Sequence, residues 1–175
     1  MDTYIIEKIK KMEGTLIGIG IENKKIKEEI QNNSNIKTCY LLEKFPSILS
    51  KKKFQIFNNK TVNIKKIKKV FKKKRIDNII CNYETVKPFL KTFVRDSVYI
   101  NKNKLYIYGE KEDIEKIVER YKRYTDEIEI KKEQDSFLII VDNKNTSNKK
   151  ITDIKYWWID TLNNIADILT AILVN

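Results

Sequence analysis

Short apolar runs alternate with helix-like segments along most of this chain. The strand-like runs cover residues 15–21, 38–42, 54–57 and 76–81. Apolar residues at helical spacing predict helices over residues 3–12, 23–31, 62–74, 84–94 and 112–124. Strands separated by helices of this length indicate βαβ units, so we expect a mainly parallel sheet covered by helices.

Two further regions complete the predicted sheet. Residues 98–108 carry two strand-like pieces around a polar turn at residues 101–103. Residues 128–130 and 137–141, separated by a polar stretch, are typical of a hairpin. We therefore expect an α/β domain whose sheet ends in an antiparallel pair.

The last part of the chain has a different pattern. Residues 142–150 are a polar linker, and residues 151–175 predict an amphipathic helix with an apolar stripe through Trp158 and Leu162. We expect this helix to pack on the domain or on a second copy in a homodimer. Docking at a membrane interface is the alternative, but the polar side of the helix is acidic, which disfavours anionic lipid, and its polar residues argue against a membrane span.

The chain is strongly basic, with 36 Lys and Arg against 24 Asp and Glu and a formal net charge of +12. Lys, Ile and Asn have A/T-rich codons, so genome composition is one explanation. The other is a surface for RNA or another polyanion. The densest run spans residues 65–75, where Ile67, Val70 and Phe71 form one helical stripe and leave lysines on the outer face. These lysines are Lys65, Lys66, Lys68, Lys69, Lys72 and Lys73.

Several classes of site are excluded by composition. The 175 residues contain no histidine, which removes Ser-His-Asp and Cys-His nucleophiles and histidine-ligated zinc. Cys39 and Cys81 are too few for a Cys₄ zinc site, so we expect no metal. We expect both cysteines to be reduced core residues. The N-terminus lacks the pattern of a signal peptide, so we expect a cytoplasmic protein.

One glycine motif follows the first predicted strand, in the run Leu16-Ile17-Gly18-Ile19-Gly20. With the order of elements over residues 15–141, it resembles the class I S-adenosylmethionine-dependent methyltransferases. The resemblance implies a Rossmann-like three-layer sandwich over residues 1–141, with Gly18 and Gly20 beside a bound S-adenosylmethionine. The family usually has an acidic residue where this chain has Leu16 and a third glycine where it has Glu22. A tight structural turn is the alternative interpretation.

The same resemblance assigns roles at two other strand ends. Glu43 closes the second strand, where the family has an acidic side chain that accepts hydrogen bonds from the ribose hydroxyls. Asn82 and Tyr83 follow the fourth strand, where nitrogen methyltransferases have an Asn or Asp, two prolines and an aromatic residue. Both prolines are missing here. Asn82 as a helix cap and Glu43 as an ordinary strand-end charge are the alternatives.

These patterns lead to two functional hypotheses. The first is an S-adenosylmethionine-dependent methyltransferase-like protein that acts on or binds RNA through its basic helix, with Asn82 and Tyr83 near the target. The second is a non-catalytic scaffold that has lost its cofactor site and binds nucleic acid or protein. The methyl acceptor stays open.

Overall fold

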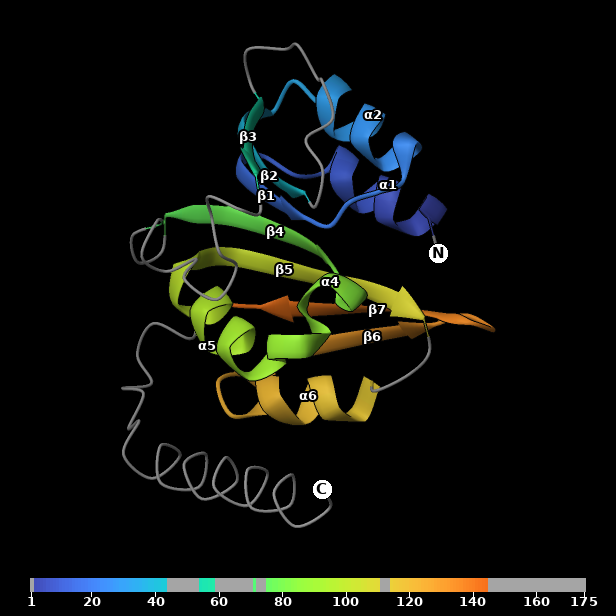
Figure 1. Ribbon diagram of the computed structural model, residues 1–175, viewed down its shortest axis with the longest axis vertical. Helices are drawn as coiled ribbons and strands as arrows, with labels where there is room; N and C mark the ends of the chain where they lie inside the picture. The colour runs from blue at the N-terminus through green and yellow to red at the C-terminus, as the bar shows by residue number, and fades with distance from the viewer. Residues whose placement is uncertain (1, 44–53, 59–70, 72–74, 111–113, 145–175) are drawn as a thin grey trace, which may run out of the picture.

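The computed structural model describes residues 2–43, 54–58, 71, 75–110 and 114–144. Helices and strands alternate along this part of the chain (Figure 1). In chain order they are α1 (Asp2–Lys10), β1 (Gly14–Ile19), α2 (Lys24–Asn32), β2 (Ile36–Glu43), β3 (Phe54–Asn58), β4 (Ile76–Asn82), α4 (Tyr83–Val86), the 3-10 helix η2 (Lys87–Phe89), α5 (Leu90–Ile100), β5 (Asn101–Glu110), α6 (Ile114–Lys122), β6 (Ile128–Lys132) and β7 (Ser136–Asp142).

The strands form one seven-stranded sheet in the order β3-β2-β1-β4-β5-β7-β6. The first five strands in this order pair in parallel with their neighbours. β7 runs antiparallel to both β5 and β6. The chain therefore has the mainly parallel sheet with a terminal antiparallel hairpin that its pattern predicts. The strand order reverses between β1 and β4, which is the place where open α/β sheets bind ligands.

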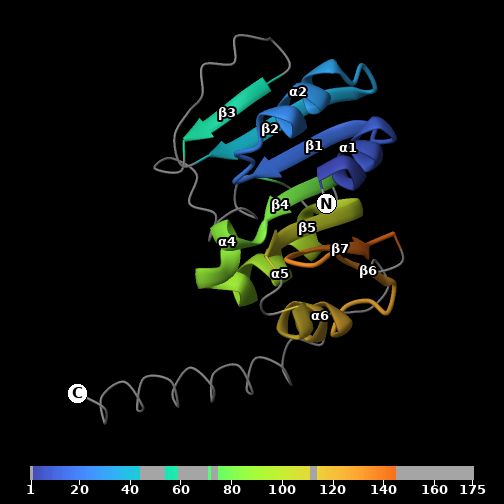
Figure 2. The same cartoon turned by 90° about the vertical axis from the view of Figure 1, so that its right-hand side faces the viewer.

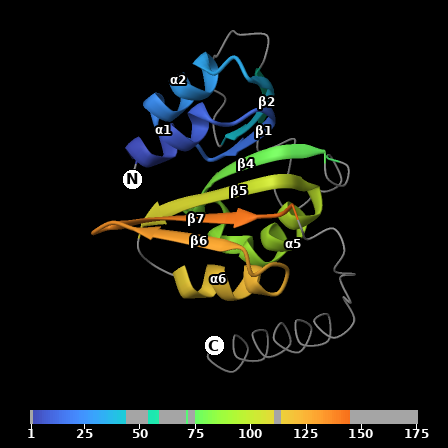
Figure 3. The same ribbon diagram turned by 180° about the vertical axis from the view of Figure 1, so that it is seen from behind.

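Helices cover both faces of the sheet, which gives three layers. Seen from behind in Figure 3, α1 and α2 lie on one face, whereas α5 and α6 lie on the other. The buried residues of α4 pack in the same core as those of α5 and α6. Successive strand residues enter opposite cores, since Leu16 packs with the α1 side and Ile17 with the α5 side. Strands buried on both faces explain why the strand-like runs are almost continuously apolar.

The two cysteines are in the core, as expected. Cys39 packs on the α1 side of the sheet and Cys81 on the α5 side, and no disulfide joins them. Phe71, from the basic run, is also buried and meets the ring of Tyr40 edge to face, with ring centroids 5.0 Å apart. None of the helices in the described residues has the length and apolar character that crossing a membrane requires.

The prediction for residues 98–108 was wrong. Residues 98–100 are the last turn of α5, and β5 is a single strand that begins at Asn101. The sequence suggested a polar turn because asparagine is common in turns. Instead, Asn101 is fully buried, and its amide donates to the carbonyl oxygens of Ile76, Asp77 and Lys104 at 3.1 to 3.3 Å.

The helix predicted over residues 84–94 is also more divided than expected. It forms three pieces, α4, η2 and α5, and its last piece continues to Ile100. Pro88 lies in η2 and has no N–H to donate, so a regular helix is interrupted there.

Candidate functional site

Three of the predicted site residues lie at one edge of the sheet. β1 pairs with β2 on one side and β4 on the other, and Ile19 is in register with both Leu42 and Cys81. Gly20, Glu43 and Asn82 each come one residue later, so they meet at the carboxyl ends of three neighbouring strands. This carboxyl edge is where the arrowheads of β1 and β2 point in Figure 2, near α4.

Gly20 has a left-handed backbone conformation, with φ of +62°. Its N–H donates to the carbonyl oxygen of Leu42 at 2.9 Å, which ties the turn to β2. A Cβ at this position would collide with Thr85 Oγ1 and lie 2.7 Å from Thr85 Cβ. The space that a side chain at Gly20 would occupy is therefore filled by a side chain from α4.

The space that a side chain at Gly18 would occupy is also filled by the protein itself. A Cβ there would lie 2.6 Å from Ile21 Cδ1 and 2.7 Å from Leu41 Cδ2. Ile21 and Leu41 are both buried in the core on the α1 side of the sheet. Packing explains the need for glycine at both positions, which agrees with the alternative of a structural turn.

The N-terminus of α2 follows this turn and is capped by its own sequence. Asn23 Oδ1 accepts hydrogen bonds from the N–H groups of Lys25 at 2.9 Å and Ile26 at 3.3 Å. The Asn23 amide donates to Asp2 Oδ2 at 2.6 Å. Glu22, in the place of the third glycine, is exposed. Two of the helix N–H groups that a bound anion would need are thus already satisfied, next to two carboxylates.

Glu43 is the last residue of β2, as predicted, and is in register with Asn58 of β3. Its neighbour Leu42 accepts the hydrogen bond from Gly20. The backbone therefore brings Glu43 to the same edge as the glycine turn. Its role in holding ribose hydroxyls stays a prediction.

Asn82 and Tyr83 have different surroundings from those expected of substrate residues. Asn82 Oδ1 accepts from the Glu84 N–H at 3.1 Å and caps α4, which is the structural alternative for this residue. Tyr83 has no exposed surface. Its ring packs edge to face against Phe137, with centroids 5.9 Å apart, so it lies in the core under α4. Stacking of Tyr83 on a substrate ring does not fit this position.

Two residues at this edge were missed by sequence reasoning. Thr85 gave no signal, because a threonine in a helix pattern says nothing about the glycine that it contacts. Tyr108, near the end of β5, has a buried hydroxyl, and burial raises the pKa of Tyr108 well above its usual value, with smaller contributions from Cys81, Asp2 and Glu22. Alternation along β5 would have placed Tyr108 on the α1 face had the strand been recognised as one piece.

Other predicted residues lie outside the described part of the chain. They are the six lysines Lys65, Lys66, Lys68, Lys69, Lys72 and Lys73, together with residues 145–150 and the helix over 151–175. At the start of the predicted linker, Asp142 ends β7 and Asn143 is fully buried. Among the described residues, no group of three or more Cys, Asp or Glu side chains is arranged to hold a metal ion.

Solved structures with the same arrangement were found. Precorrin 8W decarboxylase from Methanobacterium thermoautotrophicum is similar with a TM-score of 0.62 and 10% identity, over 81% of this chain and 89% of that chain. A putative RNA methyltransferase from Pyrococcus horikoshii has a TM-score of 0.56 and 12% identity, over 83% of each chain. A putative S-adenosyl-L-methionine-dependent methyltransferase from Methanococcus maripaludis has a TM-score of 0.54 and 17% identity, over 79% and 81%.

By sequence, no protein-family model and no curated protein matches the chain. The similarity to solved structures, at 10 to 17% identity, is one of fold. The fold of this chain is therefore that of the class I S-adenosylmethionine-dependent methyltransferases.

Proposed function

We propose that this chain is a methyltransferase-fold protein that has lost its cofactor site and works as a binding scaffold. The observation that carries the proposal is that other side chains of the protein pack against both glycines of the turn. The spaces beside Gly18 and Gly20 are filled by Ile21, Leu41 and Thr85, so these glycines serve internal packing. A ligand that approached Gly20 from the side of its missing Cβ would have to displace Thr85, which lies between the buried residues Tyr83 and Val86.

The methionine end of S-adenosylmethionine also lacks suitable partners here. Its carboxylate needs N–H donors, but Asn23 already accepts from two of the first N–H groups of α2. Exposed Asp2 and Glu22 stand next to that helix end and would repel a carboxylate. Leu16, in the place of the family's acidic residue, is an apolar side chain buried in the core. The residues present therefore do not fit the cofactor.

Methyl transfer is the second candidate, because Glu43 favours it. The backbone of Glu43 ends β2 next to Leu42, which accepts the Gly20 N–H, and the resemblance implies an acidic residue at this strand end as a partner for the ribose hydroxyls. Of the structures with this fold, one putative methyltransferase from Streptococcus mutans was solved with S-adenosylhomocysteine bound. If this chain holds the ribose of the cofactor at Glu43, the N–H groups of α2 that Asn23 now occupies would still have to be freed for the methionine carboxylate.

Equilibrium binding by calorimetry separates the two candidates. We expect the purified protein to bind neither S-adenosylmethionine nor S-adenosylhomocysteine at concentrations up to millimolar. Micromolar binding by the wild type would overturn the scaffold proposal, and its loss in Glu43→Gln would establish the ribose contact. Lys24→Gln, on an exposed residue, is the matched control for that substitution.

Two variants identify what closes the site. Thr85→Gly removes the side chain that fills the space beside Gly20, and Asn23→Gly frees the two N–H groups of α2 at a stability cost of only a few tenths of a kcal/mol. We expect measurable binding of S-adenosylhomocysteine in the double variant and not in the wild type. Equal absence of binding in both would mean that Thr85 and Asn23 are not the obstruction.

A further inference from the structure

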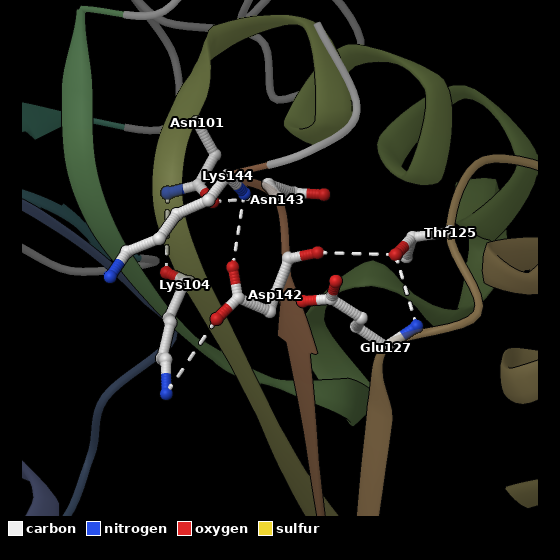
Figure 4. A network of polar contacts seen from close by, with 7 residues as sticks. All are labelled: Asn101, Lys104, Thr125, Glu127, Asp142, Asn143 and Lys144. Atoms are coloured by element: carbon white, nitrogen blue, oxygen red, sulfur yellow. Dashed lines mark hydrogen bonds and ion pairs between the residues drawn. The ribbon is translucent and has the colours of Figure 1, made fainter. Parts of the chain in front are cut away.

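The opposite edge of the sheet is organised by a buried polar network. At this amino edge the start of β4, the start of β5 and the end of β7 meet (Figure 4). The Asn143 amide donates to Asn101 Oδ1 at 2.8 Å, and the Asn143 N–H donates to the Asn103 carbonyl oxygen at 2.7 Å. Asn101 in turn donates to three backbone carbonyl oxygens, so three chain segments are locked together.

Four exposed residues lie within two positions of the residues of this network along the chain. Arg75 precedes the first residue of β4, Tyr99 is in the last turn of α5, Lys102 follows Asn101, and Lys144 follows Asn143. We call them the amino-edge surface. The Lys144 N–H donates to Asp142 Oδ1 at 3.0 Å, and Figure 4 shows the Lys144 side chain extending to the same side as Lys104. The side chains of all four residues are exposed to solvent.

In the two ion pairs at this edge, the basic side chain is the more exposed partner. Lys102 Nζ lies 3.8 Å from Asp77 Oδ1, but the lysine side chain is 62% exposed and the aspartate only 22%. Lys104 and Asp142 show the same contrast, at 40% and 21%. Solvent therefore meets the ammonium groups first. Exposed acids occur at both edges of the sheet: Glu13, Asp126 and Glu127 at this one, and Asp2, Glu22, Glu84 and Glu110 at the carboxyl edge. A polyanion would therefore have to contact this edge over its exposed cations.

Tyr99 gives this surface a second kind of contact. It is 37% exposed, and among the described residues only Ile130 is a more exposed large hydrophobic side chain. Cationic side chains beside an exposed aromatic ring are the elements of single-strand binding, since phosphates bind the cations and a base stacks on the ring. A single exposed ring suits a base better than a lipid bilayer, which takes up a larger apolar face.

We propose that the amino-edge surface binds single-stranded nucleic acid, with phosphates on Arg75, Lys102 and Lys144 and one base stacked on Tyr99. A flexible single strand can bend over the sheet edge from β5 to the end of α5. The bound nucleic acid would lie at the opposite end of the sheet from the edge where a methyltransferase of this fold holds its cofactor. Binding here is independent of whether Gly20 and Glu43 hold a ligand.

Fluorescence anisotropy with a labelled oligouridine of about fifteen nucleotides tests the proposal. The triple variant Arg75→Gln, Lys102→Gln and Lys144→Gln removes three charges. We expect at least a tenfold loss of affinity at low salt and a fall of about 2 in the slope of log affinity against log salt. The matched control removes three exposed lysines elsewhere, as Lys24→Gln, Lys25→Gln and Lys116→Gln, and we expect less than a threefold loss.

The ring of Tyr99 is tested separately. Tyr99→Ala should weaken oligouridine binding about tenfold without changing the salt slope, and Tyr99→Phe should restore it, because the ring and not the hydroxyl stacks. Thermal unfolding of each variant checks that the fold is kept. Equal binding by Tyr99→Ala and wild type would overturn the stacking contact.

Three outcomes would overturn the surface as a whole. The first is no binding of oligouridine at low salt. The second is binding to vesicles of anionic lipid with none to oligouridine. The third is an equal loss of affinity in the triple variant and its control, together with a loss of all salt dependence in a further variant. That variant changes six lysines to glutamine: Lys65, Lys66, Lys68, Lys69, Lys72 and Lys73. That last result would assign binding to the lysine-rich run instead.

Discussion

The two ends of β1 carry the same local feature with different surroundings. Gly14 begins the strand with φ of +80°, and Gly20 follows it with φ of +62°. A Cβ on Gly14 would collide with the carboxylate of Asp77, near the start of β4. A Cβ on Gly20 would collide with Thr85, which comes just after β4. The segment that contains β4 therefore closes over β1 at both of its ends.

The difference lies in what holds each neighbour in place. Asp77 Oδ2 accepts a hydrogen bond from the Thr15 N–H at 2.8 Å, so its carboxylate belongs to the structure of the turn. Thr85 is positioned by its helix, between the buried residues Tyr83 and Val86. A glycine beside a strand end is thus weak evidence for a ligand until the atoms that fill its missing side chain are known.

The largest effect should come from adding a side chain at Gly20. Gly20→Ala combines a left-handed backbone with a Cβ only 2.7 Å from Thr85 Cβ, which side-chain rotation cannot relieve. We expect a loss of about 3 kcal/mol in the free energy of unfolding, measured by urea denaturation. In a Thr85→Gly background the loss should fall to the backbone strain alone, about 1 kcal/mol.

Thr85→Ala sharpens this test, because it keeps the Cβ that causes the collision. It should rescue Gly20→Ala far less than Thr85→Gly does. Additive effects of Gly20→Ala and Thr85→Gly would contradict the contact, since residues in collision must couple.

A smaller effect is expected at the other end of the strand. Gly14→Ala forces the Asp77 carboxylate aside, but this group is the end of a side chain and can rotate at the loss of one hydrogen bond. We expect a loss of about 2 kcal/mol, and Asp77→Ala should remove part of it in the double variant. If Gly14→Ala proved more damaging than Gly20→Ala, the order of rigidity inferred for the two ends would be reversed.

The smallest effect concerns Tyr106, on β5 between the two edges. Burial raises the pKa of Tyr106 to about 12 from 10, and Asp142 and Glu129 add to the shift. The folded state then keeps a proton that the unfolded state loses, so this contribution is complete below pH 10 and disappears as the pH rises toward 12. We expect Tyr106→Phe to reduce the alkaline loss of stability by about 1 kcal/mol at pH 11.

Urea denaturation at several alkaline pH values measures this change. Tyr99→Phe, which removes an exposed hydroxyl, is the matched control. An unchanged alkaline profile in Tyr106→Phe would show that the buried phenol does not control stability in that pH window.

Much of the fold follows from patterns that are local in the sequence. Continuous apolar runs with flanking helices predict a parallel sheet buried on both faces, and β1, β2, β3 and β4 appear where those runs are. The hairpin of β6 and β7 is equally local. The candidate site was harder to predict than the fold, because Asn82 and Gly20 each support a structural and a functional interpretation. The sequence alone does not say which residues contact these two positions.

The sequence by itself determined the alternation of elements, the two buried faces of the sheet and the absence of histidine chemistry. Only the tertiary structure decided what fills the space at Gly20, that Tyr83 is in the core and that Asn101 begins a strand instead of forming a turn. The physical reason is that hydrophobic periodicity records which side of an element is buried. The contacts of a single glycine, asparagine or tyrosine depend on residues far away along the chain, such as Thr85, Phe137 and Asn143.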